Sequence, residues 1–124
     1  MGYRSEVAYA FYPTDEEHKG VITLWLKENL PFDAWDIAEY WNIDEGSGKY
    51  VFHALDVKWY ADIPEVLLVE EAGRKFIDLF CNDGDNSKGA CEHVRIGENT
   101  EDMVSEYHGN AEYILSISRS IHVY

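Results

Sequence analysis

This sequence has little positive charge and no long apolar run. It contains 10 lysines and arginines against 24 aspartates and glutamates, which gives a formal net charge of −14. A chain of this charge repels nucleic acid and anionic membranes, because both bind proteins through basic side chains. Its most apolar segment, VITLWL at residues 21–26, is too short to span a bilayer, and no secretion signal is recognisable. We therefore expect a cytoplasmic protein that makes no direct contact with nucleic acid or membrane.

Cysteine is also scarce. Cys81 and Cys91 flank a loop rich in turn-forming residues, and we expect two buried thiols rather than a disulfide. Two cysteines alone are too few for a zinc site built on thiolates, and no cofactor is predicted. Aromatic residues are abundant, with four tryptophans, nine tyrosines and five phenylalanines. They can fill the core of a single domain over residues 1–124.

Hydrophobic patterns divide the chain into strands and helices. Strands are predicted over residues 6–12, 37–42, 49–60, 90–97 and 111–124. One helix begins with the capping pair Thr14 and Glu17, and a second runs over 62–80 from the pair Asp62 and Glu65. A short helix over 32–40 is the alternative to the second strand. The acidic stretch 98–110 is expected to be an exposed loop with at most one helical turn at 101–106.

The predicted order β-α-β-β-α-β-β indicates an α+β fold of the ferredoxin-like kind. Such a fold has an antiparallel sheet with two helices packed on one face. In the central strand 49–60, we expect one set of side chains to face the helices: Val51, His53, Leu55, Val57 and Trp59. The other set should lie on an open outward face with residues of other strands: Tyr12, Tyr50, Phe52, His93, Arg95, Ser118 and His122.

That outward face is one candidate site. A small ligand or nucleotide would contact His93, Arg95, His122, Tyr50 and Phe52. RNA could stack on the same rings, but the chain lacks the basic surround that RNA needs. His53, His93 and His122 could hold a metal ion, although their spacing is not that of a metal motif. Residues 82–86 fail the EF-hand spacing, and no nucleophile motif surrounds Ser118 and Ser120.

The acidic residues form the preferred candidate site. We expect them on loops and helix starts, where a carboxylate surface can match a basic groove on a partner and accelerate association. The partner-binding residues predicted in this way are Asp44, Glu45, Glu98, Glu101, Asp102 and Glu106. The alternative is that the acidity serves solubility alone.

Short segments spread over nearly the whole chain resemble a group of small proteins encoded by tailed phages. These segments are the opening MGYRSEVA, the central VKWY with the following IPEV, the segment VRIGE with Glu101 and Asp102 after it, and the terminal SISRSI. The resemblance implies a virus-encoded protein that acts in the cytoplasm of a bacterial host. No chemistry is assigned to the group, so the resemblance transfers no catalytic residue, cofactor or target.

We therefore expect a non-enzymatic phage protein that binds and inhibits or modulates a host protein. A nucleic-acid-binding defence factor would offer the basic surface, and an anti-CRISPR or related anti-defence role is the concrete form of this hypothesis. The alternative is a small-ligand or nucleotide-binding protein or enzyme that uses the outward sheet face. A further alternative is a structural phage protein that forms a homo-dimer or larger homo-oligomer through its aromatic sheet face.

Overall fold

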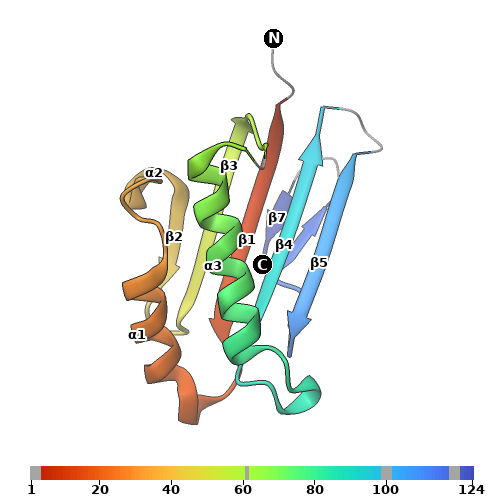
Figure 1. Cartoon of the computed structure of the whole chain (residues 1–124). Helices are drawn as coiled ribbons and strands as arrows, with labels where there is room; N and C mark the ends of the chain where they lie inside the picture. Colours follow the sequence, from red (N-terminus) through yellow and green to blue (C-terminus); the bar gives the residue numbers. More distant parts are fainter. Residues whose placement is uncertain (1–3, 61, 99–101, 118–120) are drawn as a thin grey trace.

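The computed structural model describes residues 4–60, 62–98, 102–117 and 121–124, with only the backbone of Ile117 and His122. The protein is α+β, with a five-stranded antiparallel sheet in the order β2-β3-β1-β4-β5 (Figure 1). Its strands are β1 (Ser5–Pro13), β2 (Trp41–Asp44), β3 (Lys49–Val57), β4 (Gly89–Gly97) and β5 (Met103–Gly109). A separate two-stranded sheet pairs β6 (Leu115–Ile117) with β7 (Ile121–Val123).

Three α-helices and two 3-10 turns complete the described chain. They are η1 (Glu16–His18), α1 (Lys19–Asn29), α2 (Ile37–Tyr40), α3 (Pro64–Phe80) and η2 (Gly84–Asn86). In the part of the chain that the structure describes, no helix is both long and apolar enough to cross a membrane.

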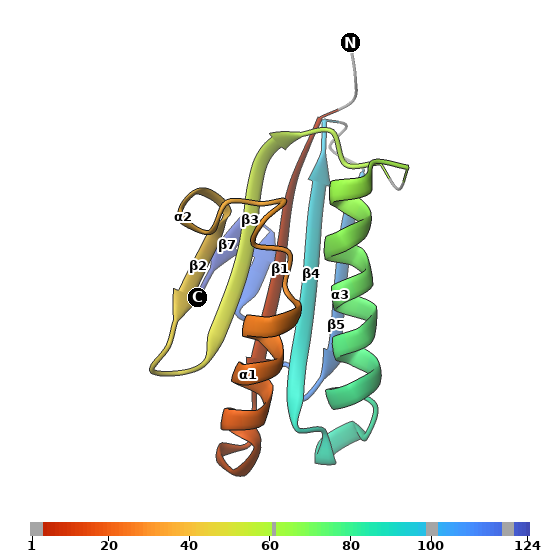
Figure 2. The same ribbon diagram turned by 60° about the vertical axis from the view of Figure 1, so that its left-hand side comes forward.

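The helices α1 and α3 pack on one face of the sheet, as predicted (Figures 1 and 2). The core between them, the helix-side core, is rich in aromatic rings. Val7, Tyr9 and Phe11 of β1 point into it on alternate positions, as the sequence pattern predicts. Edge-to-face pairs, such as Phe11 with Phe76 and Trp35 with Phe52, fix the orientation of these rings relative to one another.

The opposite face of the sheet is covered rather than open. Residues 111–117 and 121–124, which we call the C-terminal arm, lie behind the sheet as seen in Figure 1. Alanines of β1 leave room for this arm to come close. The second core that forms here contains Ala8, Ala10, Tyr12, Val51, Ala90, Val94, Ile114, Leu115 and Ile121. The prediction of one long fifth strand over 111–124 in the main sheet is therefore wrong, and residues 118–120 lie outside the described chain.

The true fifth strand is β5, which the sequence pattern predicted to be an acidic loop. It pairs with β4 from Ile96 opposite Met103 to Ala90 opposite Gly109. The stretch carries charged and polar side chains on both faces because it forms an edge of the sheet, so the apolar alternation that identifies a strand is weak.

The predicted facing of β3 is wrong in its first half. Tyr50 and Phe52 are buried in the helix-side core, and Val51 packs against the C-terminal arm. Alternation separates two sets of side chains but does not say which set meets the helices when both faces are covered. Val57 and Trp59 do join the helix-side core as predicted. The backbone turns at Asp56, where φ is 54°, and the alternation shifts there.

The segment 32–43 combines both predicted alternatives, because the short helix α2 runs directly into strand β2. Both predicted capping pairs are wrong. Asp15, not Thr14, caps the first turn by accepting from the Glu17 N–H at 3.0 Å. The cap position of α3 is Ile63, without a side-chain bond, so Pro64 in the first turn marks this start instead.

Candidate functional site

The structure does not bring the predicted partner-binding residues into one patch. Asp44 and Glu45 lie in the β2–β3 turn, whereas Glu98 and Asp102 flank the β4–β5 connection at the opposite end and edge of the sheet (Figure 1). Glu106 is exposed in the middle of β5. Glu101 lies outside the described residues.

Two of these carboxylates are held where β4 ends and β5 begins. Glu98 accepts a hydrogen bond from the backbone N–H of Arg4 at 2.6 Å. Asp102 forms an ion pair with Arg95 at 3.3 Å, and both side chains are partly exposed. These contacts close the upper end of the sheet in Figure 1, so they have a structural role there.

The predicted ligand face is not assembled either. Tyr50 and Phe52 are buried under the helices, and Arg95 is held by Asp102. His93 lies on the helix side of the sheet, while His53 bonds Glu6 at 2.7 Å on the other side. The side chain of His122 lies outside the described residues. His53 and His93 therefore cannot share a metal ion, and the covered rings Tyr50 and Phe52 cannot form an oligomer contact.

The connections at the lower end of the molecule in Figure 1 carry a partly different set of acidic residues. Four connections meet there: β1–α1, β2–β3, α3–β4 and β5–β6. We call this region the acidic end and define it by Asp15, Glu16, Glu17, Asp44, Glu45, Asp83, Asp85 and Glu112, all at least partly exposed. A shallow cleft of about 190 Å³ lies between three of these connections and is lined by Asp15, Glu16, Ser47 and Glu112, among others.

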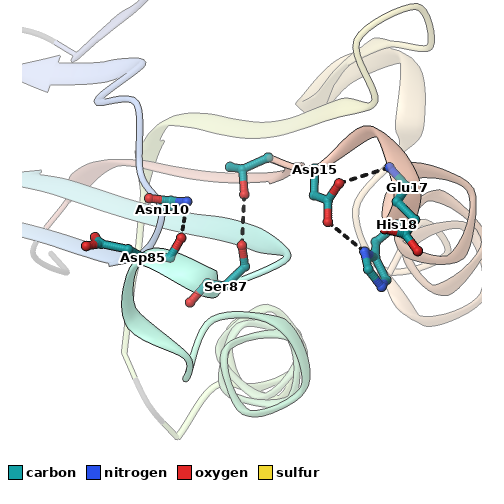
Figure 3. A network of polar contacts seen from close by, with 7 residues as sticks. Asp15, Glu17, His18, Asp85, Ser87 and Asn110 are labelled. Carbon is teal, nitrogen blue, oxygen red and sulfur yellow. Dashed lines mark hydrogen bonds and ion pairs between the residues drawn. The ribbon is translucent and has the colours of Figure 1, made fainter.

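Hydrogen bonds fix the connections of the acidic end to one another. Thr14 donates its backbone N–H to the Lys88 carbonyl at 3.1 Å and its hydroxyl to the Ser87 carbonyl at 3.2 Å. The Asn110 side chain donates to the Asp85 carbonyl at 3.0 Å (Figure 3). Lys19 donates to the Gly46 carbonyl in the β2–β3 turn. The carboxylates are thus carried by tethered loops.

Asp15 is held by two hydrogen bonds within the β1–α1 connection. Its side chain accepts from the Glu17 N–H and from the His18 ring at 2.8 Å (Figure 3). The hydrogen bond from His18, followed by that from Glu17, lowers the pKa of Asp15 below its ordinary value. These bonds therefore stabilise the negatively charged form of Asp15.

A pocket of about 280 Å³ lies between α3 and the β4–β5 edge. We call it the α3–β5 pocket. It is lined by Tyr9, Glu70, Gly73, Arg74, Ile77, Cys91, His93, Glu106 and His108. Gly73 makes the close approach of α3 possible, because a Cβ there would stand 3.3 Å from the Tyr9 ring. The pocket is where the helix-side core reaches the surface.

Burial controls the protonation of this pocket. It lowers the pKa of His93 and raises that of Cys91 well above its ordinary value, so both are neutral near pH 7. Burial likewise raises the pKa of the neighbouring Cys81 to about 12. Both cysteines are free and buried, as predicted from the sequence. The His93 ring stacks on Tyr9 with 4.0 Å between ring centroids.

Glu92 is a buried acidic side chain that the sequence pattern did not predict. It is fully inaccessible to solvent and accepts hydrogen bonds from Tyr12 and from the backbone N–H groups of Ile114 and Leu115, at 3.1 and 2.9 Å. Tyr12 in turn accepts from the Glu112 N–H at 2.6 Å. The pair ties the C-terminal arm to the sheet, which is an architectural role. The only feature of the sequence that could have indicated this buried carboxylate is its position as a single acidic residue on an otherwise apolar face of the strand.

No protein-family model matches this chain, and no match was found among curated proteins or among solved structures.

Proposed function

We propose that this protein is a non-enzymatic binding protein that attaches to a basic surface of another protein through its acidic end. The observation that carries the proposal is that four connections, each with acidic residues, lie together at that end. Acidic residues that are far apart in the sequence lie there, Asp44 and Glu45 among them, whereas the predicted residues Glu98, Asp102 and Glu106 lie on or beside β5.

The charges of the surrounding residues support this choice. Two lysines near the acidic end are held by the chain itself: Lys19 bonds the Gly46 carbonyl, and Lys49 lies over the Tyr12 ring, with 5.9 Å from its ammonium group to the centroid. A third, Lys88 of the α3–β4 connection, acts on Asp15 through its charge. Lys27 faces Glu45 at 3.8 Å. The acidic field is therefore only partly neutralised locally, and a field of this sign steers basic partners and accelerates their encounter.

Tethered loops also favour binding. A surface that is already ordered loses less conformational entropy on association than one that orders on contact. The bonds between Thr14 and Ser87, and between Asn110 and Asp85, hold three of the four connections in a fixed relation. Affinity at this end then depends mainly on charge and shape.

We infer further that the chain is a phage-encoded protein of a ferredoxin-like fold that inhibits or modulates a host factor in the bacterial cytoplasm. The fold assignment is supported by the strand order β2-β3-β1-β4, with β5 added at the edge. The viral assignment is supported by the sequence resemblance alone. A nucleic-acid-binding defence factor fits the proposed partner, because such proteins present basic grooves.

The test uses three full-length, tagged chains. The first is the natural sequence. The second neutralises the acidic end with Glu16→Gln, Glu45→Gln, Asp83→Asn and Asp85→Asn, none of which removes a described side-chain hydrogen bond. The third is a matched control with Asp33→Asn, Glu39→Gln, Asp62→Asn and Glu65→Gln, four exposed acids toward the opposite end.

Each chain is used to capture proteins from bacterial lysate at low and at high salt. We expect one basic protein to be retained by the natural sequence and by the control, to be released by salt, and to be lost with the neutralised acidic end. Equal retention by the two variants would contradict the assignment of the acidic end. Absence of any salt-sensitive partner from the lysate of a susceptible host would contradict the proposed function itself.

A further inference from the structure

Four side chains of metal-ligating type are arranged on one face of two neighbouring strands. Cys91 and His93 are two residues apart on β4, and Glu106 and His108 are two residues apart on β5. The register places Cys91 opposite His108 and His93 opposite Glu106. Directly opposed residues in an antiparallel pair have Cβ atoms about 4.5–5.5 Å apart, so the four side chains start from the corners of a small rectangle.

All four side chains line the α3–β5 pocket, and Glu70 of α3 lines it from the other side. The set comprises two imidazoles, a thiol and carboxylates. This combination suits a borderline divalent ion such as zinc, whereas magnesium and calcium prefer oxygen ligands alone.

One contact fixes the tautomer of His93. Its Nδ1 lies 3.3 Å from the carbonyl oxygen of Ala8, which can only accept a hydrogen bond, so Nδ1 carries the hydrogen. Nε2 is then left with a free lone pair. Metal-binding histidines are commonly held in this manner, with the second ring nitrogen donating to a backbone carbonyl. Stacking on Tyr9 fixes the ring plane.

We propose that the α3–β5 pocket binds one zinc-class divalent metal ion through His93, His108, Glu106 and the Cys91 thiolate. Closure on the ion requires rotation of Glu106 and His108, whose side chains lie at the surface with 3.6 Å between Oε2 and Nε2. Cys91 releases its proton as the metal–sulfur bond forms. The site is independent of the acidic end and of the proposed partner.

A second group of ligand atoms provides the main competitor. Within the described residues, Asp15, Glu17 and His18 are the group whose ligand atoms all lie within 4.8 Å of one another, whereas those of the α3–β5 pocket come together only after Glu106 and His108 rotate. That arrangement is explained by the helix cap, in which Asp15 accepts from both Glu17 and His18. His18→Ala is therefore the control that distinguishes the two locations.

The measurement is a titration of the purified full-length chain with zinc chloride against a chromophoric chelator. We expect one equivalent to bind. His108→Ala and Glu106→Gln should each weaken binding by about tenfold or more, while circular dichroism stays unchanged because both residues lie at the surface. His18→Ala should leave the affinity within about twofold of the natural chain. Arg74→Ala should strengthen binding, because it removes a positive charge from the pocket wall.

Cobalt(II) gives an independent readout. A thiolate ligand produces a near-ultraviolet charge-transfer band, which Cys91→Ser should abolish while His18→Ala leaves it intact. The proposal is overturned if no stoichiometric binding occurs at micromolar zinc. It is equally overturned if His108→Ala and Glu106→Gln leave the affinity unchanged, or if His18→Ala abolishes binding.

Discussion

Glu92 shows how one polar residue can organise a large apolar surface. It lies in a strand whose other arm-facing residues are apolar, and its carboxylate satisfies two backbone N–H groups of the C-terminal arm. Buried polar groups are tolerated where every bond is made, and they then fix one arrangement among the many that apolar contacts alone would allow. The tyrosine hydroxyl of Tyr12 completes this set, and burial followed by the bond to Glu92 raises the pKa of Tyr12.

Removing the Tyr12 hydroxyl tests this anchor. Tyr12→Phe loses a donor to Glu92 and an acceptor for the Glu112 N–H, so we expect the free energy of unfolding to fall by about 1–3 kcal/mol. Tyr124→Phe makes the same chemical change at an exposed side chain of the arm and should change stability by less than about 0.5 kcal/mol. Urea denaturation measures both.

Hydrogen exchange shows where the loss occurs. In Tyr12→Phe, the amides of Ile114 and Leu115 should exchange faster relative to those of β1 and β3, because the arm is loosened from the sheet. Equal acceleration at all amides would mean that Tyr12 contributes to general packing and not to the attachment of the arm.

Two glycines test the close approaches between elements. Gly109 ends β5 with φ of 76°, and a Cβ there would meet the Gly89 carbonyl oxygen and stand 3.0 Å from the Cβ of Cys81. Gly109→Ala should therefore destabilise the protein by more than the roughly 1–2 kcal/mol that a left-handed backbone alone imposes. A Cβ added at Gly20 would meet no atom within 4 Å, so Gly20→Ala in α1 should stabilise by up to about 1 kcal/mol.

Thermal unfolding of the two glycine variants separates the contributions. A melting temperature that falls for Gly109→Ala and rises for Gly20→Ala is the expected pattern. A neutral Gly109→Ala would contradict the tight junction between β5, the start of β4 and the end of α3.

The elements with strong patterns are the ones that the sequence predicts well. β1, α3 and β4 have long apolar repeats, and their observed limits agree with the predicted ones to within two residues. β5 was missed because its charged edge hides the alternation, and the arm was misplaced because its two short strands read as one long strand. In both places the pairing partner, which a local pattern does not contain, decides the structure.

The sequence predicts that the candidate site is acidic, but it does not predict which carboxylates lie together. Net charge indicates that carboxylates dominate the surface, yet which of them gather depends on which connections share an end of the sheet. Of the predicted partner-binding residues, Asp44 and Glu45 lie at the acidic end, whereas Glu98 and Asp102 lie at the other end with Arg4 and Arg95. The α3–β5 pocket could not be predicted from the sequence, because residues 103–109 were predicted to be a loop. Only the pairing of β5 with β4 places Glu106 and His108 opposite His93 and Cys91.

At the scale of the whole molecule, the two candidate sites lie in different places and differ in their side chains. One end carries the acidic loops, and the β4–β5 side carries a pocket lined by ligand-type side chains. Both faces of the sheet are filled, by the helices on one side and by the arm on the other. A partner can therefore bind at the connections, at the sheet edges or on the outward sides of the helices, where Leu24 and Leu79 are exposed.

The most direct test of the central claim is the rate at which the captured partner associates with the protein as ionic strength is raised. We expect a steep fall in the association rate constant for the natural chain and for the matched control. We expect a shallow fall for the chain with a neutralised acidic end, with an association rate about tenfold lower at low salt and a dissociation rate that changes little. Identical salt dependence in all three chains would contradict the claim that the acidic end recognises the partner.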